Sequence, residues 1–309
     1  MAKVKRVCFS YRELPEGGEV SAQPKISDEV AVKQSQHLIF LIHGFNVNKL
    51  EAENAYDGFH KLQDIPPDEG RYGIGRTFVE VYWPGDASFA SFLFYQRSIQ
   101  RAIKTAEQLA DYLVTNIGSH TQIDIVAHSM GCRLATELLR ALKDKPVIDR
   151  IVFMAGAIPT FMLDQGNPSR RLRPSYNKVL RDKSLNLYST TDRVLTWLFP
   201  AGESLDPREG FLPTALGHDK WIDYTVPINF EQQQNPGAGH SDYWGQDKAN
   251  IEQHCAKNAA QEVQKFLQFP SAGSRTISNR PLKENVIIEA RKNGANRKII
   301  NRDIPAYVS

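Results

Sequence analysis

The sequence predicts an α/β fold in which a mostly parallel central sheet carries helices on both faces. Strand-like and helix-like segments alternate from about residue 37 to residue 268, which is the pattern of successive strand–helix–strand units. His37–Ile42 is a continuous apolar run, typical of a strand buried on both faces. In the helix expected at about 91–115, apolar residues recur every three or four positions, so one helix face packs on the sheet.

The individual elements follow from apolar patterning and from the turn residues between them. The N-terminal stretch VKRVCFSYRELPEGGEV predicts one or two edge strands. Core strands are expected at His37–Ile42, Thr77–Trp83, Gln122–Val126, Asp149–Ala157, Ser184–Thr190 and Trp221–Ile228. Helices are expected at about 49–62, 91–115, 130–142 and 247–269. A short strand at Val286–Ile288 is not assigned to the core.

We expect one domain over residues 1–269 and a basic extension over residues 270–309. The chain of 309 residues is long enough for one large core. Two polar, irregular excursions interrupt the alternation at about 158–183 and 196–220. The extension has eight lysine or arginine residues against three acids, or +5, and the other 30 basic and 32 acidic residues leave −2.

This charge distribution argues against nucleic acid as a partner, because the body is nearly neutral. The basic extension is either a solvated tail or a weak contact to an anionic surface. The N-terminus has no apolar signal-peptide core, and no run of 18 apolar residues occurs. The three cysteines are widely spaced and form no disulfide framework. We therefore expect a cytoplasmic protein, and the oligomeric state is left open.

Ser129 is the candidate nucleophile. It stands where the strand ending at Val126 meets a helix, and Ala127 and Gly131 flank it two residues away on each side. This is the small-x-Ser-x-small form of the nucleophile elbow, in which a sharp turn presents the serine Oγ at a helix N-terminus. The alternative is an ordinary serine N-cap.

The loop His43-Gly44-Phe45, directly after the first strong strand, is the candidate oxyanion hole. The elbow supplies one backbone N–H from Met130, and the earlier loop supplies the second from Phe45. Gly44 lets the backbone turn so that this N–H points inward, and the Phe45 side chain lines the acyl pocket. We assign His43, Gly44 and His128 to support of this loop and pocket, and expect His128 to point away from the reacting serine.

Asp192 is the candidate acid. It follows the strand Ser184–Thr190 at once, and the acid comes after the serine in this arrangement. Asp206 and Asp219 are rivals inside irregular loops. A turn or helix cap is the structural alternative for Asp192.

His240 is the candidate base, because it follows the last predicted strand by about a dozen residues. The preceding Asn235–Gly239 stretch is rich in turn residues, which suits a loop that places an imidazole over the serine. His218 precedes that strand, and His254 lies inside the closing helix. The sequence shows no metal-ligand spacing and no glycine-rich phosphate loop, so we expect no metal and no cofactor.

These stretches resemble the α/β-hydrolase superfamily. LIFLIHGFN, DIVAHSMG, YSTTDRVL and GHSDYW occur in the order of that family, over about residues 37 to 268. The HGFN loop and the helix FYQRSIQRAIKTAEQLADYL are similar to an uncharacterised bacterial branch, the domain-of-unknown-function group 900 type. The AHSMG elbow is also similar to lipases and carboxylesterases.

The resemblance implies a Ser129–His240–Asp192 triad, with Phe45 and Met130 as oxyanion donors and the two excursions in the place of lids. We expect an enzyme that cleaves a small-molecule or lipid ester through an acyl-enzyme. Two alternatives stay open. One is a phospholipase, thioesterase or amidase that uses the same triad. The other is a non-catalytic binding protein on a hydrolase scaffold.

Overall fold

The computed structural model describes most of the chain up to residue 268. The described ranges are 6–13, 18–63, 76–86, 95–142, 147–162, 183–204, 212–220, 231–245 and 254–268. Contacts between Cα atoms divide the chain into Met1–Pro270 and Ser271–Ser309. The predicted extension 270–309 and the predicted strand at Val286–Ile288 lie outside the described residues, and the proposed domain division stays a prediction.

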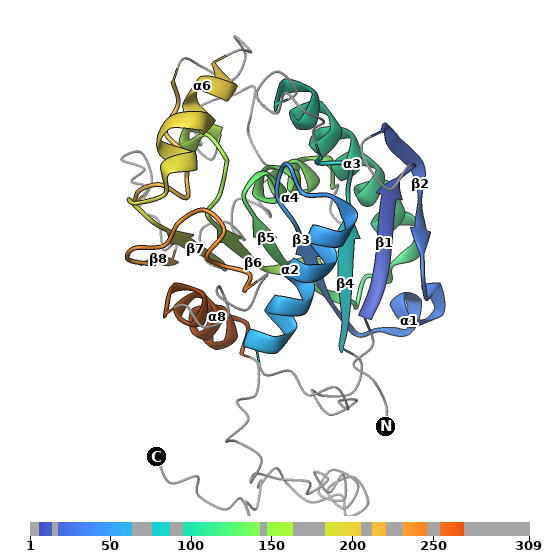
Figure 1. Cartoon of the computed structure of the whole chain (residues 1–309). Coiled ribbons are helices and arrows are strands. Elements are labelled where there is room, and N and C mark those ends of the chain that lie inside the picture. Colours follow the sequence, from blue (N-terminus) through green and yellow to red (C-terminus); the bar gives the residue numbers. More distant parts are fainter. Residues whose placement is uncertain are drawn as a thin grey trace, which may run out of the picture. The chain divides into compact units, whose positions relative to one another are not determined.

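The centre of the structure is an eight-stranded sheet in the order β2-β1-β4-β3-β5-β6-β7-β8 (Figure 1). The strands are β1 (Arg6–Arg12), β2 (Val20–Ile26), β3 (His37–Ile42), β4 (Arg76–Tyr82), β5 (Gln122–His128), β6 (Val147–Met154), β7 (Ser184–Tyr188) and β8 (Glu231–Gln234). Only the β1–β2 pair is antiparallel among these strands. The predicted α/β class with a mostly parallel sheet is confirmed.

The register of the central strands aligns their carboxyl ends. Ile42 at the end of β3 pairs with Val81 of β4 and with Ala127 of β5. Met154 of β6 pairs with His128 on one side and with Leu187 of β7 on the other. The loops that leave these strands therefore emerge at one edge of the sheet, where open α/β sheets build their sites.

Helices cover both faces of the sheet, as predicted. The longer ones are α2 (Lys49–Leu62), α3 (Tyr95–Asn116), α4 (Met130–Ala141) and α8 (His254–Leu267), and the short α1 spans Glu29–Gln34. In Figure 1, α2 and α8 lie in front of the sheet. Helices α3 and α4 pack against each other, and α4 also packs on β3 and β5.

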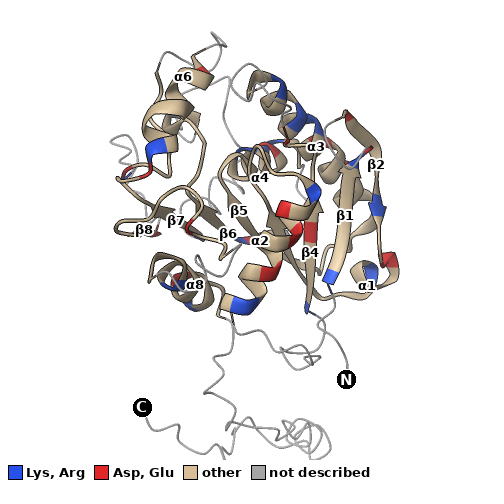
Figure 2. Cartoon of the chain, viewed as in Figure 1, with Lys and Arg blue, Asp and Glu red and all other residues tan. Residues whose placement is uncertain are grey.

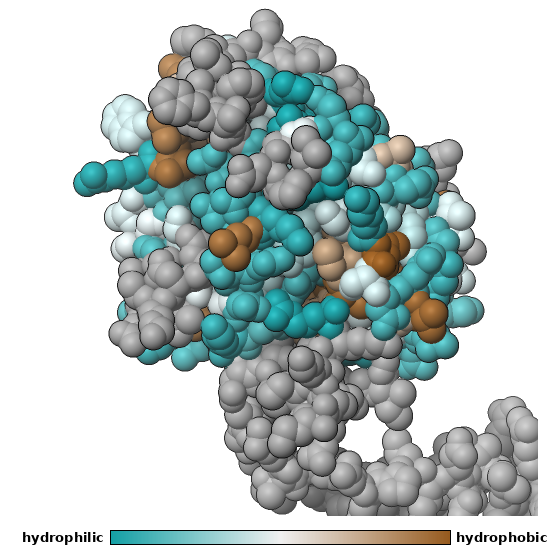
Figure 3. All heavy atoms as spheres, turned by 45° about the vertical axis from the view of Figure 1, so that its right-hand side comes forward, coloured by the Kyte–Doolittle hydropathy of each residue, from teal (hydrophilic) through white to brown (hydrophobic). Residues whose placement is uncertain are grey.

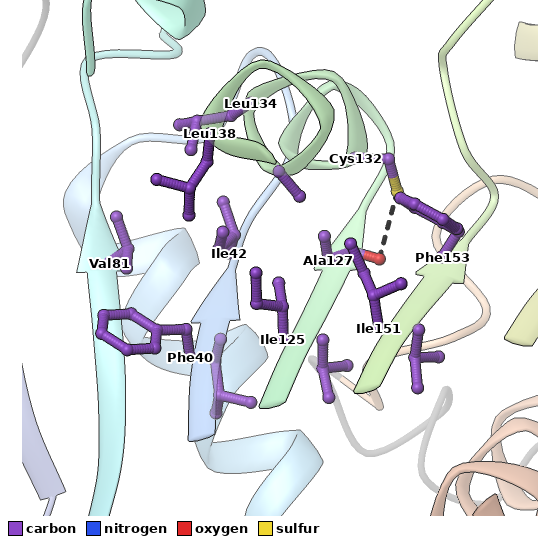
Figure 4. Close-up of a cluster of buried hydrophobic side chains, with 14 of the residues drawn as sticks. Phe40, Ile42, Val81, Ile125, Ala127, Cys132, Leu134, Leu138, Ile151 and Phe153 are labelled. Carbon is purple, nitrogen blue, oxygen red and sulfur yellow. Dashed lines mark hydrogen bonds between the residues drawn. The ribbon is translucent and has the colours of Figure 1, made fainter. Parts of the chain in front are cut away.

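The buried surface of α4 fixes the helix to the strands beneath it. Figure 4 shows Leu134 and Leu138 of α4 above the apolar side chains of β3, β4 and β5. Cys132, one turn into the helix, is buried and its thiol contacts the carbonyl oxygen of Ala127 at 3.2 Å. The start of α4 is thus held against the end of β5.

Two sequence predictions about strands need revision. The prediction of edge strands at the N-terminus is wrong for β1, which pairs with β2 on one side and with β4 on the other. The last strand in the described part of the chain is β8, Glu231–Gln234, whereas the predicted strand Trp221–Ile228 lies outside the described residues. Four consecutive polar residues carry no apolar signal, so β8 is invisible to hydrophobic patterning.

The two excursions each begin with a short helical segment in the part that the structure describes. The excursion at 196–220 begins in helical structure, a π-helical turn at Val194–Leu198 (η3) followed by α6 at Phe199–Glu203. The one at 158–183 begins with a short 3-10 helix at Thr160–Met162 (η1). Residues 163–182 and 205–211 lie outside the described part of the chain.

Charged and apolar side chains are spread over the described surface. Figure 2 shows residues of both signs on α2 and α3. On the face in Figure 3, hydrophobic side chains form small separated patches. The exposed large apolar residues are Val30, Leu50, Val114, Trp197, Leu198 and Leu212. Within the described ranges, the helices are all too short or too polar to span a bilayer.

Candidate active site

Ser129 occupies a strained turn between β5 and α4. Its φ of 54° and ψ of −126° lie in a region that non-glycine residues rarely adopt. The backbone of the turn is held at both ends, because the Ser129 N–H donates to Met154 O at 3.0 Å and its carbonyl accepts from Cys132 and Ala157. Strain of this kind costs about 1–3 kcal/mol and persists where the surroundings impose it.

Two glycines leave the space that this turn requires. A Cβ on Gly131 would lie 2.5 Å from His43 O and 2.6 Å from Ile42 O. A Cβ on Gly44 would lie 2.7 Å from the Cβ of Ser129 itself. The close approach of the loop after β3 to the serine therefore depends on glycine at both positions.

The Ser129 hydroxyl bonds to an imidazole and does not cap α4. No side-chain cap hydrogen bond forms at this helix start. The Oγ lies 2.7 Å from His240 Nε2, and His240 Nδ1 lies 2.7 Å from Asp192 Oδ2. Because a carboxylate only accepts hydrogen bonds, Nδ1–H donates to Asp192, and Nε2 accepts a hydrogen bond from the Ser129 hydroxyl.

Asp192 is fully buried, and contacts to both of its carboxylate oxygens hold the side chain in one orientation. Its Oδ1 accepts from the N–H groups of Val194 at 3.0 Å and Leu195 at 3.1 Å, at the start of η3. Its Oδ2 faces His240. The structure thus brings together the three residues that the sequence singled out, from the ends of β5, β7 and β8.

Hydrogen bonds connect the predicted oxyanion loop to the turn that follows β4. The Trp83 indole donates to His43 O at 2.8 Å, and Asn46 N donates to Gly85 O at 2.8 Å. Buried Arg12 bonds both Val47 O and the Asp86 carboxylate, at 2.6 Å each. Sequence reasoning missed the support roles of Trp83 and Arg12.

The Trp83-Pro84-Gly85-Asp86 turn carries a sequence signal for the support role of Trp83. A tryptophan followed by a tight turn at the carboxyl end of a parallel strand lies at the edge where sites are built. Arg12 carried no such signal, because its partners are 35 and 74 residues away in sequence.

His43, which the sequence assigned to support of this loop, is buried within it. Its Nδ1–H donates to Gly44 O at 2.9 Å, and its ring stacks on Trp83 with 5.7 Å between centroids. Burial, and then the charge of Arg12, lower the pKa of His43 to about 3. His43 is therefore neutral at physiological pH.

His128 lies inside the site, although the sequence suggested that it points away. Its Nε2 lies 2.8 Å from the backbone carbonyl oxygen of His240, and the two imidazole centroids are 5.2 Å apart. At a turn as sharp as this one, the side chain before the serine remains beside the loop that carries the base.

A cavity of about 490 Å³ opens above Ser129. The residues at its base include His43, Gly44, Phe45, His128, Ser129, Met130 and His240. One wall is apolar and comes from η3 and α6, with Val194, Leu195, Leu198 and Phe199. Helix α2 and the loop before it contribute the polar residues Asn46, Glu51 and Asn54 together with Val47 and Ala55. The cavity lining therefore combines apolar side chains of η3 and α6 with polar side chains of α2 and the loop before it.

The residues of the site offer no cluster of metal ligands. Within the described ranges, no group of three or more His, Cys, Asp or Glu side chains is arranged to hold a metal ion. His43 and His128 are both engaged with backbone carbonyl groups. The described side chains around Ser129 are instead arranged as a hydroxyl, an imidazole and a carboxylate in sequence.

Comparison with solved structures finds distant similarities at low identity. Esterase PE8 is 15% identical with a TM-score of 0.40, over 76% of this chain and 92% of that chain. Carboxyl esterase 2 of the fungus Tuber melanosporum is 11% identical with a TM-score of 0.40, over 76% and 79%. The poly(3-hydroxybutyrate) depolymerase LpqC of Bordetella parapertussis is 16% identical with a TM-score of 0.38, over 78% and 82%.

A family model provides the clearest relationship. No curated protein sequence matches the chain. The model described as "Alpha/beta hydrolase of unknown function (DUF900)" matches residues 18–195, which is more than half of the chain. This segment includes the loop after β3, the serine elbow and Asp192. The chain belongs to this family of α/β-hydrolases.

Proposed function

We propose that the protein is a serine hydrolase that cleaves carboxylic esters through an acyl-enzyme intermediate. The observation that carries the proposal is the pair of 2.7 Å hydrogen bonds that join Ser129 to His240 and His240 to Asp192. A buried carboxylate that fixes one imidazole tautomer beside a strained serine is the arrangement that activates a hydroxyl for attack.

In the first half of the reaction, Ser129 Oγ attacks the ester carbonyl carbon while His240 Nε2 takes its proton. The tetrahedral intermediate then collapses, the carbon–oxygen bond to the alcohol breaks, and the imidazolium returns the proton to the leaving oxygen. In the second half, water attacks the acyl carbon while His240 takes a proton from it, the bond between the acyl carbon and Ser129 Oγ breaks, and the imidazolium returns the proton to Oγ as the carboxylic acid leaves. Asp192 stabilises the imidazolium in both halves.

The backbone N–H groups of Phe45 and Met130 are the proposed oxyanion donors. Both residues line the cavity beside Ser129. Within the described part of the chain, neither N–H donates a hydrogen bond to another residue, so both are available to the developing charge. A donor of this kind contributes about 3 kcal/mol to transition-state stabilisation. The N-terminus of α4 adds a favourable dipole.

The apolar wall supports an apolar acyl group on the substrate. Val194, Leu195, Leu198 and Phe199 face the cavity from η3 and α6. Apolar walls of this kind contribute affinity in proportion to the area that the ligand buries. We therefore place the acyl chain along this wall and the alcohol portion along the polar side formed by α2.

A fluorophosphonate probe tests the proposal directly. The folded protein should form one covalent adduct, which peptide mass spectrometry should locate on Ser129. Ser129→Ala should abolish labelling, and Ser21→Ala, a change on the outer strand β2, should label like the native protein. A folded native protein that stays unlabelled, or an adduct on another serine, would overturn the proposal.

A panel of p-nitrophenyl esters of increasing chain length then measures the acyl preference. We expect the highest kcat/KM for apolar acyl chains of intermediate length, because the cavity is of limited volume. Thioesters with the same acyl groups serve as the comparison. A preference for thioesters over matched oxygen esters would change the substrate class while it left the triad in place.

A further inference from the structure

His128, the last residue of β5, sits against the loop that carries His240. The residue is 7% exposed. Its ring lies 5.2 Å from the His240 ring and 6.0 Å from each of the rings of Tyr243 and Trp244. Aromatic groups from the 240–244 loop therefore surround this imidazole, and its ε nitrogen reaches the backbone of His240 at 2.8 Å.

The contact defines which nitrogen of His128 carries the proton. A carbonyl oxygen can only accept a hydrogen bond, so Nε2–H is the donor. Burial and the neighbouring His240 lower the pKa of His128 to about 3, so the ring is neutral and Nδ1 carries no proton. A neutral donor holds the carbonyl without placing a second positive charge beside the imidazolium that forms on His240.

Other hydrogen bonds hold the chain around His240, and the following ones act on its neighbours in the chain. Before it, Ala238 O accepts from the hydroxyls of Ser189 at 2.7 Å and Thr191 at 3.1 Å. Beside it, the N–H of Gly239 donates to the Asp242 carboxylate at 2.8 Å. The His128 contact is the described bond that acts on the peptide carbonyl of His240.

We propose that His128 is a positioning residue for the general base: its Nε2–H holds the His240 carbonyl and so fixes the imidazole between Ser129 and Asp192. The inference rests on the proposed function, because it assigns His240 the role of base. His128 is the residue before the nucleophile, and its hydrogen bond thereby fixes the position of the base relative to the nucleophile. A displacement of about 1 Å at such a base lowers the rate by about 10²-fold.

A matched pair of substitutions tests the hydrogen bond separately from the volume of the side chain. The glutamine side chain in His128→Gln carries its amide nitrogen about as far from the backbone as the histidine Nε2, so it retains a donor. The methionine side chain in His128→Met has the same reach and no donor. We expect His128→Met to lower kcat for p-nitrophenyl acetate about 10- to 100-fold with little change in KM. His128→Gln should recover most of that loss.

The outcomes are distinguishable. Equal kcat values for the two variants, whether both high or both low, would overturn the proposal, because the donor would then make no difference. Urea unfolding of each variant confirms that the compared proteins are folded. If the native protein fails to label with fluorophosphonate, the proposed function fails, and these rates lose their meaning.

A second measurement uses the native full-length chain and no substrate. In ¹⁵N-histidine NMR, His128 should appear as a neutral ring protonated at Nε2, with a slowly exchanging proton, from about pH 8 down to about pH 5. A ring protonated at Nδ1, or one that titrates near the ordinary histidine pKa of about 6.5, would contradict the hydrogen bond. This result stands whether or not the protein hydrolyses esters, and it also holds if the variants fold poorly.

Discussion

Ser129 combines an unfavourable backbone conformation with a hydroxyl that faces the cavity. A φ of 54° is tolerated because Gly44 and Gly131 give the turn room, and because Met154 and Ala157 hold its backbone. The sequence predicted this turn from its small flanking residues. The sequence could not predict that the His128 side chain contacts the loop of His240, because side-chain direction at a strained turn depends on the backbone angles.

The buried histidines make the stability of the protein dependent on pH. The pKa values of His43 and His128 are lowered to about 3, mainly by burial, and burial also lowers the pKa of His60. The unfolded chain binds these protons near pH 6.5, whereas the folded chain does not, so stability falls as the pH drops below about 6.5. We predict a loss of roughly 2 kcal/mol for each of His43 and His128 between about pH 7 and about pH 5.

Urea unfolding at about pH 7 and about pH 5 measures this loss. His128→Gln removes one of the titrating groups, so its free energy of unfolding should depend less steeply on pH than that of the native protein. Equal stability of the native protein at the two pH values would contradict the expected burial of neutral imidazoles.

At the scale of elements, apolar patterning located the central strands and helices well. β3 and α2 have the predicted bounds, because a continuous apolar run and a capping residue mark them: Asn48 caps α2 in a full capping box with Glu51. The π-helical turn at Val194–Leu198 was missed, since it is set by the Asp192 carboxylate on two backbone N–H groups. β8 was missed because its residues are all polar.

Helix α2 provides a prediction about the alcohol portion of the substrate. Glu51 lines the cavity, and the described lining residues include no lysine or arginine; the acidic residues of α2 are visible in Figure 2. We expect a cationic leaving group to be favoured over a matched neutral one, and Glu51→Gln to reduce that preference about two- to fivefold. The ratio of kcat/KM for choline esters to that for isosteric neutral esters is the measurement.

The substitution is well controlled because glutamine also completes a capping box, so α2 keeps its N-terminal hydrogen bonds. Glu53→Gln removes a charge from the same helix, where Glu53 pairs with Lys49 at 3.6 Å and does not line the cavity. The same loss of preference in both variants would point to a general field effect and contradict a role for Glu51 at the site.

At the scale of the whole molecule, the order of the site residues along the chain was predictable and their supports were not. Ser129 and Asp192 follow strands that apolar patterning predicts, and the carboxyl ends of parallel strands meet at one edge of a sheet, so the sequence places these two residues together. His240 follows β8, which apolar patterning misses, and its position after the acid in the chain order identified it as the candidate base. Arg12 and Trp83 act on the loop after β3 through contacts across the sheet. Such contacts depend on strand order, and β1 was expected at the edge of the sheet.

The basic extension provides a prediction for the complete chain. If its eight lysine and arginine residues are changed to glutamine in the full-length protein, we expect kcat/KM for small uncharged esters to stay within about twofold, because an uncharged substrate is neither attracted nor repelled by the charge of the extension. A large loss would assign the extension a part in catalysis. Salt-sensitive binding of the native protein, but not the variant, to phosphatidylserine vesicles would favour an anionic surface as its partner.

The short edge strand β8 determines when the site is completed. His240 lies 111 residues after Ser129 and 48 after Asp192, and it is positioned by a four-residue strand that pairs with β7 alone among the described strands. A nascent chain on the ribosome therefore contains the serine and its carboxylate partner before the imidazole has been synthesised. Pairings this distant in sequence also form slowly. A translation product that ends before His240 would therefore lack the proposed base, and the proposed hydrolytic activity would be absent from it.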